Sequence, residues 1–240
     1  MKKVAVITGA NGGLGAEICN LLLSQAYSVI GLDLNWTDNT KFDFQNWQSI
    51  EIDLSIAENV QQTFEDIRYR YGGIDVLVNN AGTCLMSDFD EITSDELIKQ
   101  IEVNFYSCFY CCQAAIPLMI DRPGIRKIIN ISSNGAYNFD VFDPPHYRAS
   151  KAAMDTLTKD LARRYAKQKI TVNSIAPAMT QTPLFDVLDE NTLSNAIAAM
   201  PHGTAMQPSQ VAEWVCFLSG KGGDVCSGNI IILNQGRDVR

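Results

Sequence analysis

The sequence predicts an α/β fold: a doubly wound parallel sheet of the Rossmann type, with about seven strands flanked by helices. Three observations lead to this prediction. Short runs rich in β-branched residues alternate with longer segments whose apolar residues recur every three or four positions. A glycine-rich turn, TGANGGLG, directly follows the first run. No repeat or linker interrupts the alternation, so we expect one domain spanning residues 1–240.

The strand candidates are short apolar runs. They are VAVI at 4–7, SVIGL at 28–32, SIEIDL at 49–54, DVLV at 75–78, KIINI at 127–131, ITVNSI at 170–175 and NIIIL at 229–233. Because helical segments separate them, the strands should run parallel, with helices on both faces of the sheet.

The segments between the strands place apolar residues on one face of a helix. The three clearest faces are Leu14, Ile18, Leu21 and Leu22; Val60, Phe64, Ile67 and Tyr71; and Ile101, Phe105, Phe109 and Cys112. TSDE at 93–96 is a capping-box start for the third helix.

One connection, residues 35–48, lacks a helical period, although a right-handed crossover normally carries a helix there. We expect a short or irregular segment whose aromatic residues cover the sheet. These aromatics are Trp36, Phe42, Phe44 and Trp47.

Composition limits the partners. A net charge of −8 without a basic stripe disfavours nucleic acid. No apolar run approaches the roughly 20 residues of a membrane helix, and VAVI is too short for a signal peptide. The seven cysteines are an odd number, which argues against a disulfide framework. We therefore expect a cytoplasmic protein without a membrane partner.

A metal site is not expected either. Cys108, Cys111 and Cys112 lie in an apolar helical stretch with no second ligand cluster. They should be small buried thiols at a helix interface. The histidines, His146 and His202, are too few for a zinc centre.

The glycine-rich turn lies between a strand and a helix, the context in which such a motif indicates dinucleotide binding. Gly9 permits a tight turn, Gly13 lets the backbone approach a pyrophosphate, and Gly15 lets the helix pack closely. The helix N-terminus offers free N–H groups to the anion. The remaining predicted contacts in the turn are Asn11, Gly12 and Leu14. A purely structural turn is the alternative.

Asp33 ends the second strand, roughly 20 residues beyond the last glycine, where an acid can accept hydrogen bonds from the adenosine ribose. A carboxylate there repels the 2′-phosphate of NADP. Its neighbours are Leu34 and Asn35, and the turn holds Asn11 and Gly12 rather than arginine. We predict NAD as the cofactor; a solvated aspartate at a strand end is the alternative.

Two tyrosine–lysine pairs share one spacing: Tyr147 with Lys151, and Tyr165 with Lys169. Ligands bind beyond the carboxyl ends of parallel strands. Tyr147 follows the strand at 127–131 and begins a helix, so it lies at that edge. The second pair lies at the far end of the same helix, so topology selects the first.

Tyrosine and lysine at this spacing suit alcohol–ketone chemistry. Removing a hydride from an alcohol carbon requires a base for the hydroxyl proton, and reduction requires the reverse acid. A tyrosine with a pKa of about 10 is a poor base at neutral pH. An ammonium group one helical turn away, at i+4, is expected to favour the phenolate.

These motifs, with NNAG at 79–82, Asn104 in a helix and ISS at 131–133, occur in an order that resembles the short-chain dehydrogenase/reductase superfamily, in its short single-domain branch. The resemblance implies an NAD-dependent oxidoreductase that interconverts a secondary alcohol and a ketone. Tyr147 would transfer the proton and Lys151 would bind the nicotinamide ribose. Ser133 would hydrogen-bond the substrate oxygen, with Ser132 as the alternative by register. Asn104 would hold a relay water, unless its amide caps an irregular helix turn.

The resemblance also implies further cofactor contacts. Asp53 and Leu54 would contact adenine, Asn80, Ala81 and Gly82 would run along the cofactor, and Thr182 would touch the carboxamide near Pro177. The alternative for Asp53 and Leu54 is a strand-end cap, that for NNAG is support of the sheet, and that for Thr182 is a plain loop turn. Two departures bear on shape: Pro177-Ala178 replaces the usual Pro-Gly, and Asn234-Gln235-Gly236 replaces Asp-Gly-Gly.

A variable lid around residues 180–203 should cover the pocket. Its expected apolar face is Leu184, Phe185, Leu188, Leu193 and Ile197, with Asp186, Asp189 and Glu190 outside. Tyr137, Phe139 and Phe142 would add aromatic lining, which suggests a medium-sized, partly apolar alcohol or ketone. The resemblance implies a homo-oligomer, a tetramer or dimer packed through helices at 94–118 and 147–168.

Two other functions are alternatives for such a sequence. A non-catalytic dinucleotide-binding sensor or scaffold would be marked by a lost tyrosine or lysine, and both are present. An epimerase or dehydratase of the longer branch would need a larger substrate domain than the short segment after Thr182 provides.

Overall fold

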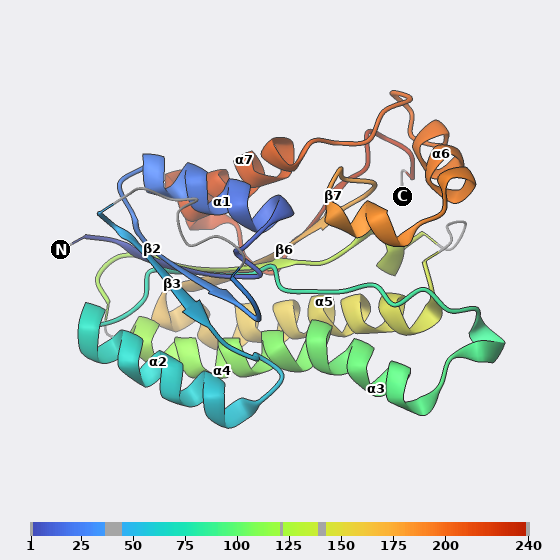
Figure 1. Ribbon diagram of the computed structural model, residues 1–240. Coiled ribbons are helices and arrows are strands. Elements are labelled where there is room, and N and C mark those ends of the chain that lie inside the picture. Colours follow the sequence, from blue (N-terminus) through green and yellow to red (C-terminus); the bar gives the residue numbers. More distant parts are fainter. Residues whose placement is uncertain (1, 37–44, 121, 139–142, 239–240) are drawn as a thin grey trace.

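The computed structural model describes residues 2–36, 45–120, 122–138 and 143–238. In this part of the chain a seven-stranded sheet has the strand order β3-β2-β1-β4-β5-β6-β7, and all its pairings are parallel (Figure 1). The strands are β1 Val4–Thr8, β2 Ser28–Asp33, β3 Trp47–Glu51, β4 Val76–Asn79, β5 Arg126–Ile131, β6 Ile170–Pro177 and β7 Ile230–Leu233. The predicted fold class is confirmed.

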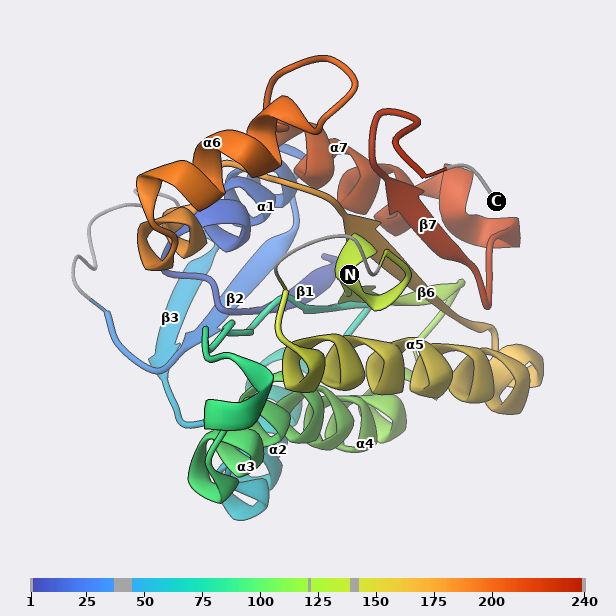
Figure 2. The same cartoon turned by 90° about the vertical axis from the view of Figure 1, so that its right-hand side faces the viewer.

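Helices cover both faces of the sheet (Figure 1). Helices α1 (Gly13–Ser24) and α7 (Pro208–Ser219) pack together on one face. Helices α2 (Ala57–Tyr71), α4 (Ser107–Ile120) and α5 (Pro145–Tyr165) lie on the other. Helices α3 (Ser94–Ile101) and α6 (Glu190–Ala198) lie toward the edge where the strands end, on opposite sides of the edge viewed in Figure 2.

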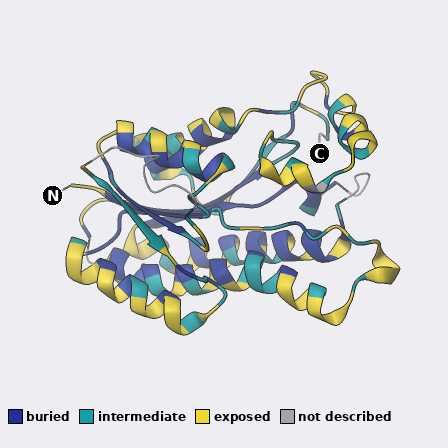
Figure 3. Cartoon of the chain, in the orientation of Figure 1, coloured by how far each residue is buried: buried dark blue, intermediate teal, exposed yellow. Residues whose placement is uncertain are grey.

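The core divides into two apolar clusters, one on each face of the sheet. Successive residues of β1 alternate between them: Val4 and Val6 belong to one cluster, and Ala5 and Ile7 to the other. All four are buried, since side chains alternate across a strand and both faces are covered (Figure 3). This explains why the strand sequences are continuously apolar rather than alternating.

The third predicted helical face is wrong. A π-helical turn, Glu102–Tyr106, joins α3 to α4, and this wider turn changes the register of the face that follows it. Phe109, expected in the core, is 40% exposed. The buried stripe is instead Gln100, Asn104, Cys108, Cys111, Cys112 and Ala115. The three thiols are buried, as predicted.

The third strand begins earlier than the sequence suggested, at Trp47 rather than at residue 49. Trp47 packs edge to face on Trp36, with ring centroids 5.7 Å apart, and both contact the core cluster. A Cβ on Gly31 would lie 2.2 Å from the Trp47 ring, so this glycine of β2 leaves room for the indole. The predicted aromatic cover is confirmed for these two tryptophans; Phe42 and Phe44 lie outside the described residues.

The predicted capping box at 93–96 is half formed. The Thr93 hydroxyl accepts a hydrogen bond from the Glu96 N–H at 3.2 Å. The Glu96 carboxylate turns elsewhere: it accepts a hydrogen bond from the Ser87 hydroxyl at 2.9 Å and lies 3.3 Å from His146 Nε2. Glu96 thereby links α3 to the first turn of α5.

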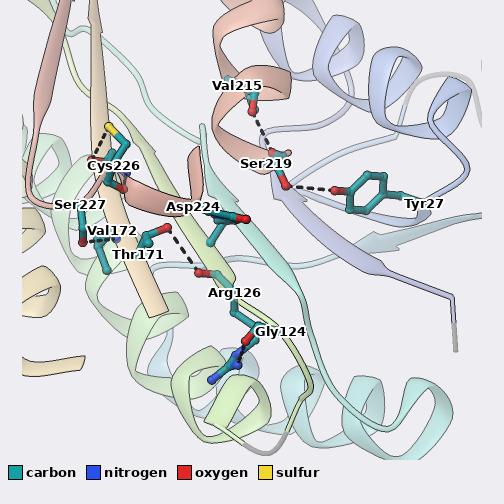
Figure 4. A network of polar contacts seen from close by, with 12 residues as sticks. Tyr27, Gly124, Arg126, Thr171, Val172, Val215, Ser219, Asp224, Cys226 and Ser227 are labelled. Carbon is teal, nitrogen blue, oxygen red and sulfur yellow. Dashed lines mark hydrogen bonds and ion pairs between the residues drawn. The ribbon is translucent and has the colours of Figure 1, made fainter. Parts of the chain in front are cut away.

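Polar contacts tie together the edge where the strands begin (Figure 4). The Tyr27 hydroxyl donates to the Ser219 carbonyl at 3.1 Å, and the Thr171 hydroxyl donates to the Arg126 carbonyl at 3.4 Å. The second tyrosine–lysine pair lies toward this edge, because Tyr165 ends α5 and Lys169 immediately precedes β6. The sheet topology therefore agrees with the prediction that this pair does not lie at the edge where the cofactor binds.

Two properties of the described residues bear on possible membrane and metal partners. The helical stretch Ser94–Ile120 spans 27 residues and is apolar enough to cross a membrane by length and composition, but half of its most apolar window is buried inside the protein. No group of three His, Cys, Asp or Glu side chains that could hold a metal ion occurs in the described part.

Candidate active site

A cavity of about 860 Å³ opens at the carboxyl edge of the sheet. It is lined by the loops that follow β1 and β4, the two strands between which the strand order reverses. Ligands of doubly wound sheets bind at such a switch point. All predicted cofactor residues except Gly15 line the cavity, as do three of the predicted catalytic residues, Tyr147, Lys151 and Ser133.

The glycine turn is a close-packed junction. Gly9 has φ +63°, the left-handed region that favours glycine, and a Cβ there would lie 2.9 Å from Ala81 Cα. A Cβ on Gly15 would lie 1.9 Å from the Gly9 carbonyl oxygen. Gly15 therefore lets the first turn of α1 close onto the turn, as predicted from the motif.

The N-terminus of α1 faces the cavity without a side-chain cap. Gly12 is its N-cap residue, no side chain bonds its free N–H groups, and its first turn holds no acid. Gly13 has φ +53°, and a Cβ on it would lie 3.1 Å from Pro183 in the lid. Uncapped N–H groups and the helix dipole favour an anion such as a pyrophosphate.

Asp33 reaches back to the glycine turn from the end of β2. Its carboxylate accepts hydrogen bonds from the backbone N–H groups of Asn11 and Leu34, each at 2.8 Å. These bonds hold a negative charge at the cavity wall beside the turn. Neither neighbour of Asp33 in the chain, Leu32 or Leu34, is a lysine or an arginine.

Thr8 and Asn80 connect the glycine turn to the end of β4. The Thr8 hydroxyl accepts from the backbone N–H groups of Asn80 and Ala81, both at 2.9 Å. The Asn80 amide donates to the carbonyls of Thr8 and Gly9. Its side chain thus supports the sheet edge, while Asn80, Ala81 and Gly82 line the cavity. Sequence reasoning did not single out Thr8.

Asp53 forms a local turn close to Asp33, since the Ile52 N–H donates to the Asp33 carbonyl at 2.7 Å. Its Oδ1 accepts from the Ser55 hydroxyl at 2.6 Å and the Ser55 N–H at 2.9 Å. The hydroxyl bond is the main cause that lowers the pKa of Asp53. Leu54 is buried beside it. One carboxylate oxygen of Asp53 therefore acts as a cap, as the alternative had it. The residue nevertheless lines the cavity.

Asn104 lies in the π-helical turn, and its amide bonds outside that turn. Its Oδ1 accepts from the Thr83 N–H at 2.8 Å, and its Nδ2 donates to the Thr83 carbonyl at 2.9 Å and the Ser150 hydroxyl at 3.0 Å. A π-turn is frequent at functional sites. Here it directs a buried amide at the loop after β4, between that loop and α5.

The two serines after β5 have different partners. The Ser132 hydroxyl donates to Asp155 at 2.8 Å. The Ser133 hydroxyl accepts from the Gly135 N–H at 3.0 Å and hydrogen-bonds the side chain of Tyr147, lowering its pKa. The Ser132 hydroxyl is thus bonded to Asp155, whereas Ser133 acts on the pKa of Tyr147, which favours Ser133 over Ser132 as the partner of Tyr147.

Lys151 lies one turn after Tyr147 and is 4% exposed. Its ammonium donates to the Ile131 carbonyl at 2.8 Å and lies 6.0 Å from the centre of the Tyr147 ring. Burial lowers the pKa of Lys151 to about 8, against smaller opposing effects of Cys108, Asp155 and Cys84.

The expected lowering of the Tyr147 pKa is wrong. Burial, followed by the charge of Asp143, raises the pKa of its phenol, and Lys151 is not among the causes. The physical reason is that desolvation of a phenolate outweighs an ammonium that is itself bonded to a carbonyl.

Three functional candidates escaped the sequence reasoning. Asp143 and Arg237 line the cavity, and Asp155 accepts hydrogen bonds from the Tyr137 and Ser132 hydroxyls. Asp155 lies one turn beyond Lys151, a spacing that could have signalled it. No sequence signal links Asp143 to Arg237, because the two meet only through folding.

The lid is partly as expected. Leu184, Phe185 and Leu188 line the cavity, as do Thr182 and Pro177, whereas Leu193 and Ile197 do not line it. Asp186, Asp189 and Glu190 are exposed, as predicted. Tyr137 bonds Asp155 rather than lining the cavity, and Phe139 and Phe142 lie outside the described residues.

The two departures from the family pattern have structural partners. Ala178 donates its N–H to the Leu233 carbonyl at 2.8 Å, which continues the pairing of β6 with β7. Gln235 has φ +59°, a backbone region that favours glycine. Its side chain accepts from the His202 N–H at 3.0 Å and donates to the Thr204 carbonyl at 3.1 Å, which ties it to the end of the lid.

The glycine turn, the uncapped helix terminus and the acidic strand end line one cavity, an arrangement suited to a dinucleotide. Among doubly wound folds, these features define the class of nicotinamide dinucleotide-binding oxidoreductases. Comparison with known proteins narrows this class. The family model described as short chain dehydrogenase matches residues 3–193, and the chain belongs to that family.

Relatives and solved structures agree with this assignment. An acetoacetyl-CoA reductase from Acinetobacter sp. (strain RA3849) is 30% identical, over 98% of this chain and 97% of its own. A diacetyl reductase, (S)-acetoin forming, from Staphylococcus epidermidis (strain ATCC 12228 / FDA PCI 1200) is 29% identical, over 98% of both. The structure of ElxO with NADP bound superposes with a TM-score of 0.91 at 25% identity, covering 99% of both chains.

Proposed function

We propose that this protein is an NAD(H)-dependent oxidoreductase that interconverts a secondary alcohol and a ketone, with Tyr147 as the acid–base residue. One observation carries the proposal: Ser133, Tyr147 and Lys151 line the same cavity. The glycine turn and Asp33 line the same cavity, so a dinucleotide bound along them leads to this wall.

The residues divide the work as follows. Bound nicotinamide supplies or accepts the hydride at the substrate carbon. The Ser133 hydroxyl orients the substrate oxygen, and Tyr147 donates a proton to it in reduction or removes one in oxidation. Because burial raises the pKa of Tyr147, its hydroxyl is protonated at neutral pH and can act as the acid that ketone reduction requires. Lys151, with a pKa of about 8, remains mostly protonated at pH 7 and can hold ribose hydroxyls.

The preference for NAD rests on Asp33. Its carboxylate is held toward the cavity by two backbone N–H groups, where a 2′-phosphate would meet a like charge. The structure of ElxO with NADP bound shows that a structural relative takes the other dinucleotide. The names of the two reductases support a carbonyl compound as the substrate.

The test follows NADH absorbance with a panel of ketones and secondary alcohols. We expect turnover by the wild type and a loss of at least about 100-fold in kcat/KM for Tyr147→Phe, the usual size of a general acid–base contribution. Tyr165→Phe is the matched control on the same helix and should keep wild-type rates. Activity that survives in Tyr147→Phe contradicts the mechanism. NADH binding without turnover of any compound would support the alternative, a dinucleotide-binding sensor or scaffold.

We also propose a cytoplasmic homo-oligomer, a tetramer or dimer. The support is an exposed aromatic pair on the helices expected at the interface: Tyr106 and Phe109 are 42% and 40% exposed. Light scattering of the purified chain measures the mass directly, and a monomer at micromolar concentration would contradict this part.

A further inference from the structure

The wall beyond Tyr147 carries a carboxyl group that the proposed reaction does not use. Asp143 lines the cavity together with Ser133, Gly135 and Tyr147. A Cβ built on Gly135 would lie 2.1 Å from Asp143 Oδ2 and 3.2 Å from Ser133 Oγ. The carboxyl group and the serine hydroxyl therefore flank the same glycine, and only a residue without a side chain leaves this space open.

Hydrogen bonds from Arg148 hold the backbone of Asp143 in place. Arg148, buried on α5 directly after Tyr147, donates through Nε to the Asp143 carbonyl at 2.7 Å and through Nη1 to the Gly135 carbonyl at 3.2 Å. It also donates to the Asn138 carbonyl. One guanidinium thus fixes the backbone of Asp143 relative to the catalytic tyrosine.

The C-terminal segment completes this wall. The Asp238 carboxylate accepts hydrogen bonds from the side-chain amides of Asn134 at 3.1 Å and Asn138 at 2.8 Å. These contacts dock the chain end on the loop after β5, and they place Arg237 in the cavity lining. The charges of Arg148 and Arg237 both act on Asp143, yet burial outweighs them and raises the pKa of its carboxyl.

No described residue donates a hydrogen bond to the Asp143 carboxyl oxygens, which face a cavity otherwise rich in apolar groups such as Met86, Leu184 and Phe185. An alkyl substituent of a substrate would shield this carboxyl group from water without donating a hydrogen bond to it. The binding free energy of such a substrate would therefore be less favourable. A hydroxyl on the carbon beside the reacting carbonyl would instead donate to it, while Ser133 and Tyr147 hold the carbonyl oxygen.

We propose that Asp143 is a specificity-determining residue that accepts a hydrogen bond from a hydroxyl beside the reacting carbon. The preferred substrates are then α-hydroxy ketones and the corresponding vicinal diols. This inference rests on the proposed function and names the substrate class of the same site.

The experiment compares 3-hydroxybutan-2-one with butan-2-one, which differ by one hydroxyl next to the carbonyl. We expect wild-type kcat/KM to favour the hydroxy ketone by roughly 10- to 100-fold, the value of a hydrogen bond to a charged group. Asp143→Ala should bring this ratio close to one, chiefly through a higher KM for the hydroxy ketone. Because the charge of Asp143 also acts on Tyr147, the readout is the ratio between the two ketones and not either rate alone. Asp143→Asn keeps an acceptor oxygen and should give an intermediate ratio.

Asp186→Ala, an exposed acid of the lid, is the matched control and should keep the wild-type ratio. A melting temperature for each variant, with and without NADH, separates altered specificity from altered folding. A wild-type ratio near one, or a ratio that Asp143→Ala does not change, overturns the inference and leaves the proposed function standing. Absence of NADH-linked turnover on every ketone and alcohol overturns both.

Discussion

Replacing Lys151 with methionine should stabilise the cofactor-free protein while removing a residue that the proposed reaction needs. The lysine is almost fully buried and its pKa falls from 10.5 to about 8. In the unfolded chain the ammonium is hydrated, so folding at neutral pH must bury a charge. Methionine fills a similar volume without that charge.

The magnitude follows from the two pKa values. Their difference corresponds to about 3 kcal/mol of unfavourable free energy at pH 7. Removing the ammonium also leaves the Ile131 carbonyl, its acceptor at 2.8 Å, without that donor, at a cost of about 1 kcal/mol. We therefore expect Lys151→Met to unfold with a free energy about 2 kcal/mol higher than the wild type at pH 7.

The stability difference between Lys151→Met and the wild type should depend on pH. Between pH 8 and 10.5 the unfolded wild type holds the Lys151 proton and the folded wild type has lost it. The unfolded state then binds more protons, so wild-type stability rises with pH in this window. The advantage of Lys151→Met should shrink by about 2 kcal/mol between pH 7 and pH 9.5.

Urea unfolding at the two pH values measures both quantities, with tryptophan fluorescence as the signal. Lys159→Met, an exposed lysine on the same helix, is the matched control and should stay within about 0.5 kcal/mol of the wild type at both pH values. A destabilised Lys151→Met at pH 7, or a difference that does not depend on pH, would refute the reasoning.

Two further predictions concern the cofactor end of the cavity. Gly15→Ala places a Cβ 1.9 Å from the Gly9 carbonyl, so we expect a loss of about 1–3 kcal/mol in urea unfolding and weaker NADH binding by fluorescence. Gly12→Ala, with φ −158° and nothing within 4 Å of the new Cβ, should leave stability nearly unchanged; equal losses would show that the close contact is not the cause. Asp33→Ala removes the charge and frees the N–H groups of Asn11 and Leu34. The ratio of kcat/KM for NADP to that for NAD should rise by roughly 10- to 100-fold, and an unchanged ratio would remove Asp33 from cofactor choice.

The sequence alone determined the fold and the side of the sheet on which the site lies. Strand runs alternating with helical periods have one economical arrangement, a parallel sheet covered on both faces, and the structure has it. The same logic separated Tyr147 from Tyr165, since both ends of α5 are placed once the strand direction is known. The glycine turn was recognisable because its spacing reflects local geometry: Gly9 takes a left-handed backbone and Gly15 makes a close contact.

Only the tertiary structure decided the properties that depend on burial and on contacts between distant segments. A helical period could not reveal the π-helical turn that buries Asn104 and exposes Phe109. Spacing placed Lys151 one turn from Tyr147 but could not show that desolvation governs the pKa of each group. Asp143 and Arg237 are separated along the chain by two strands and three α-helices. They share a cavity because Arg148 and Asp238 hold the loop and the chain end together, a long-range arrangement that no local pattern encodes.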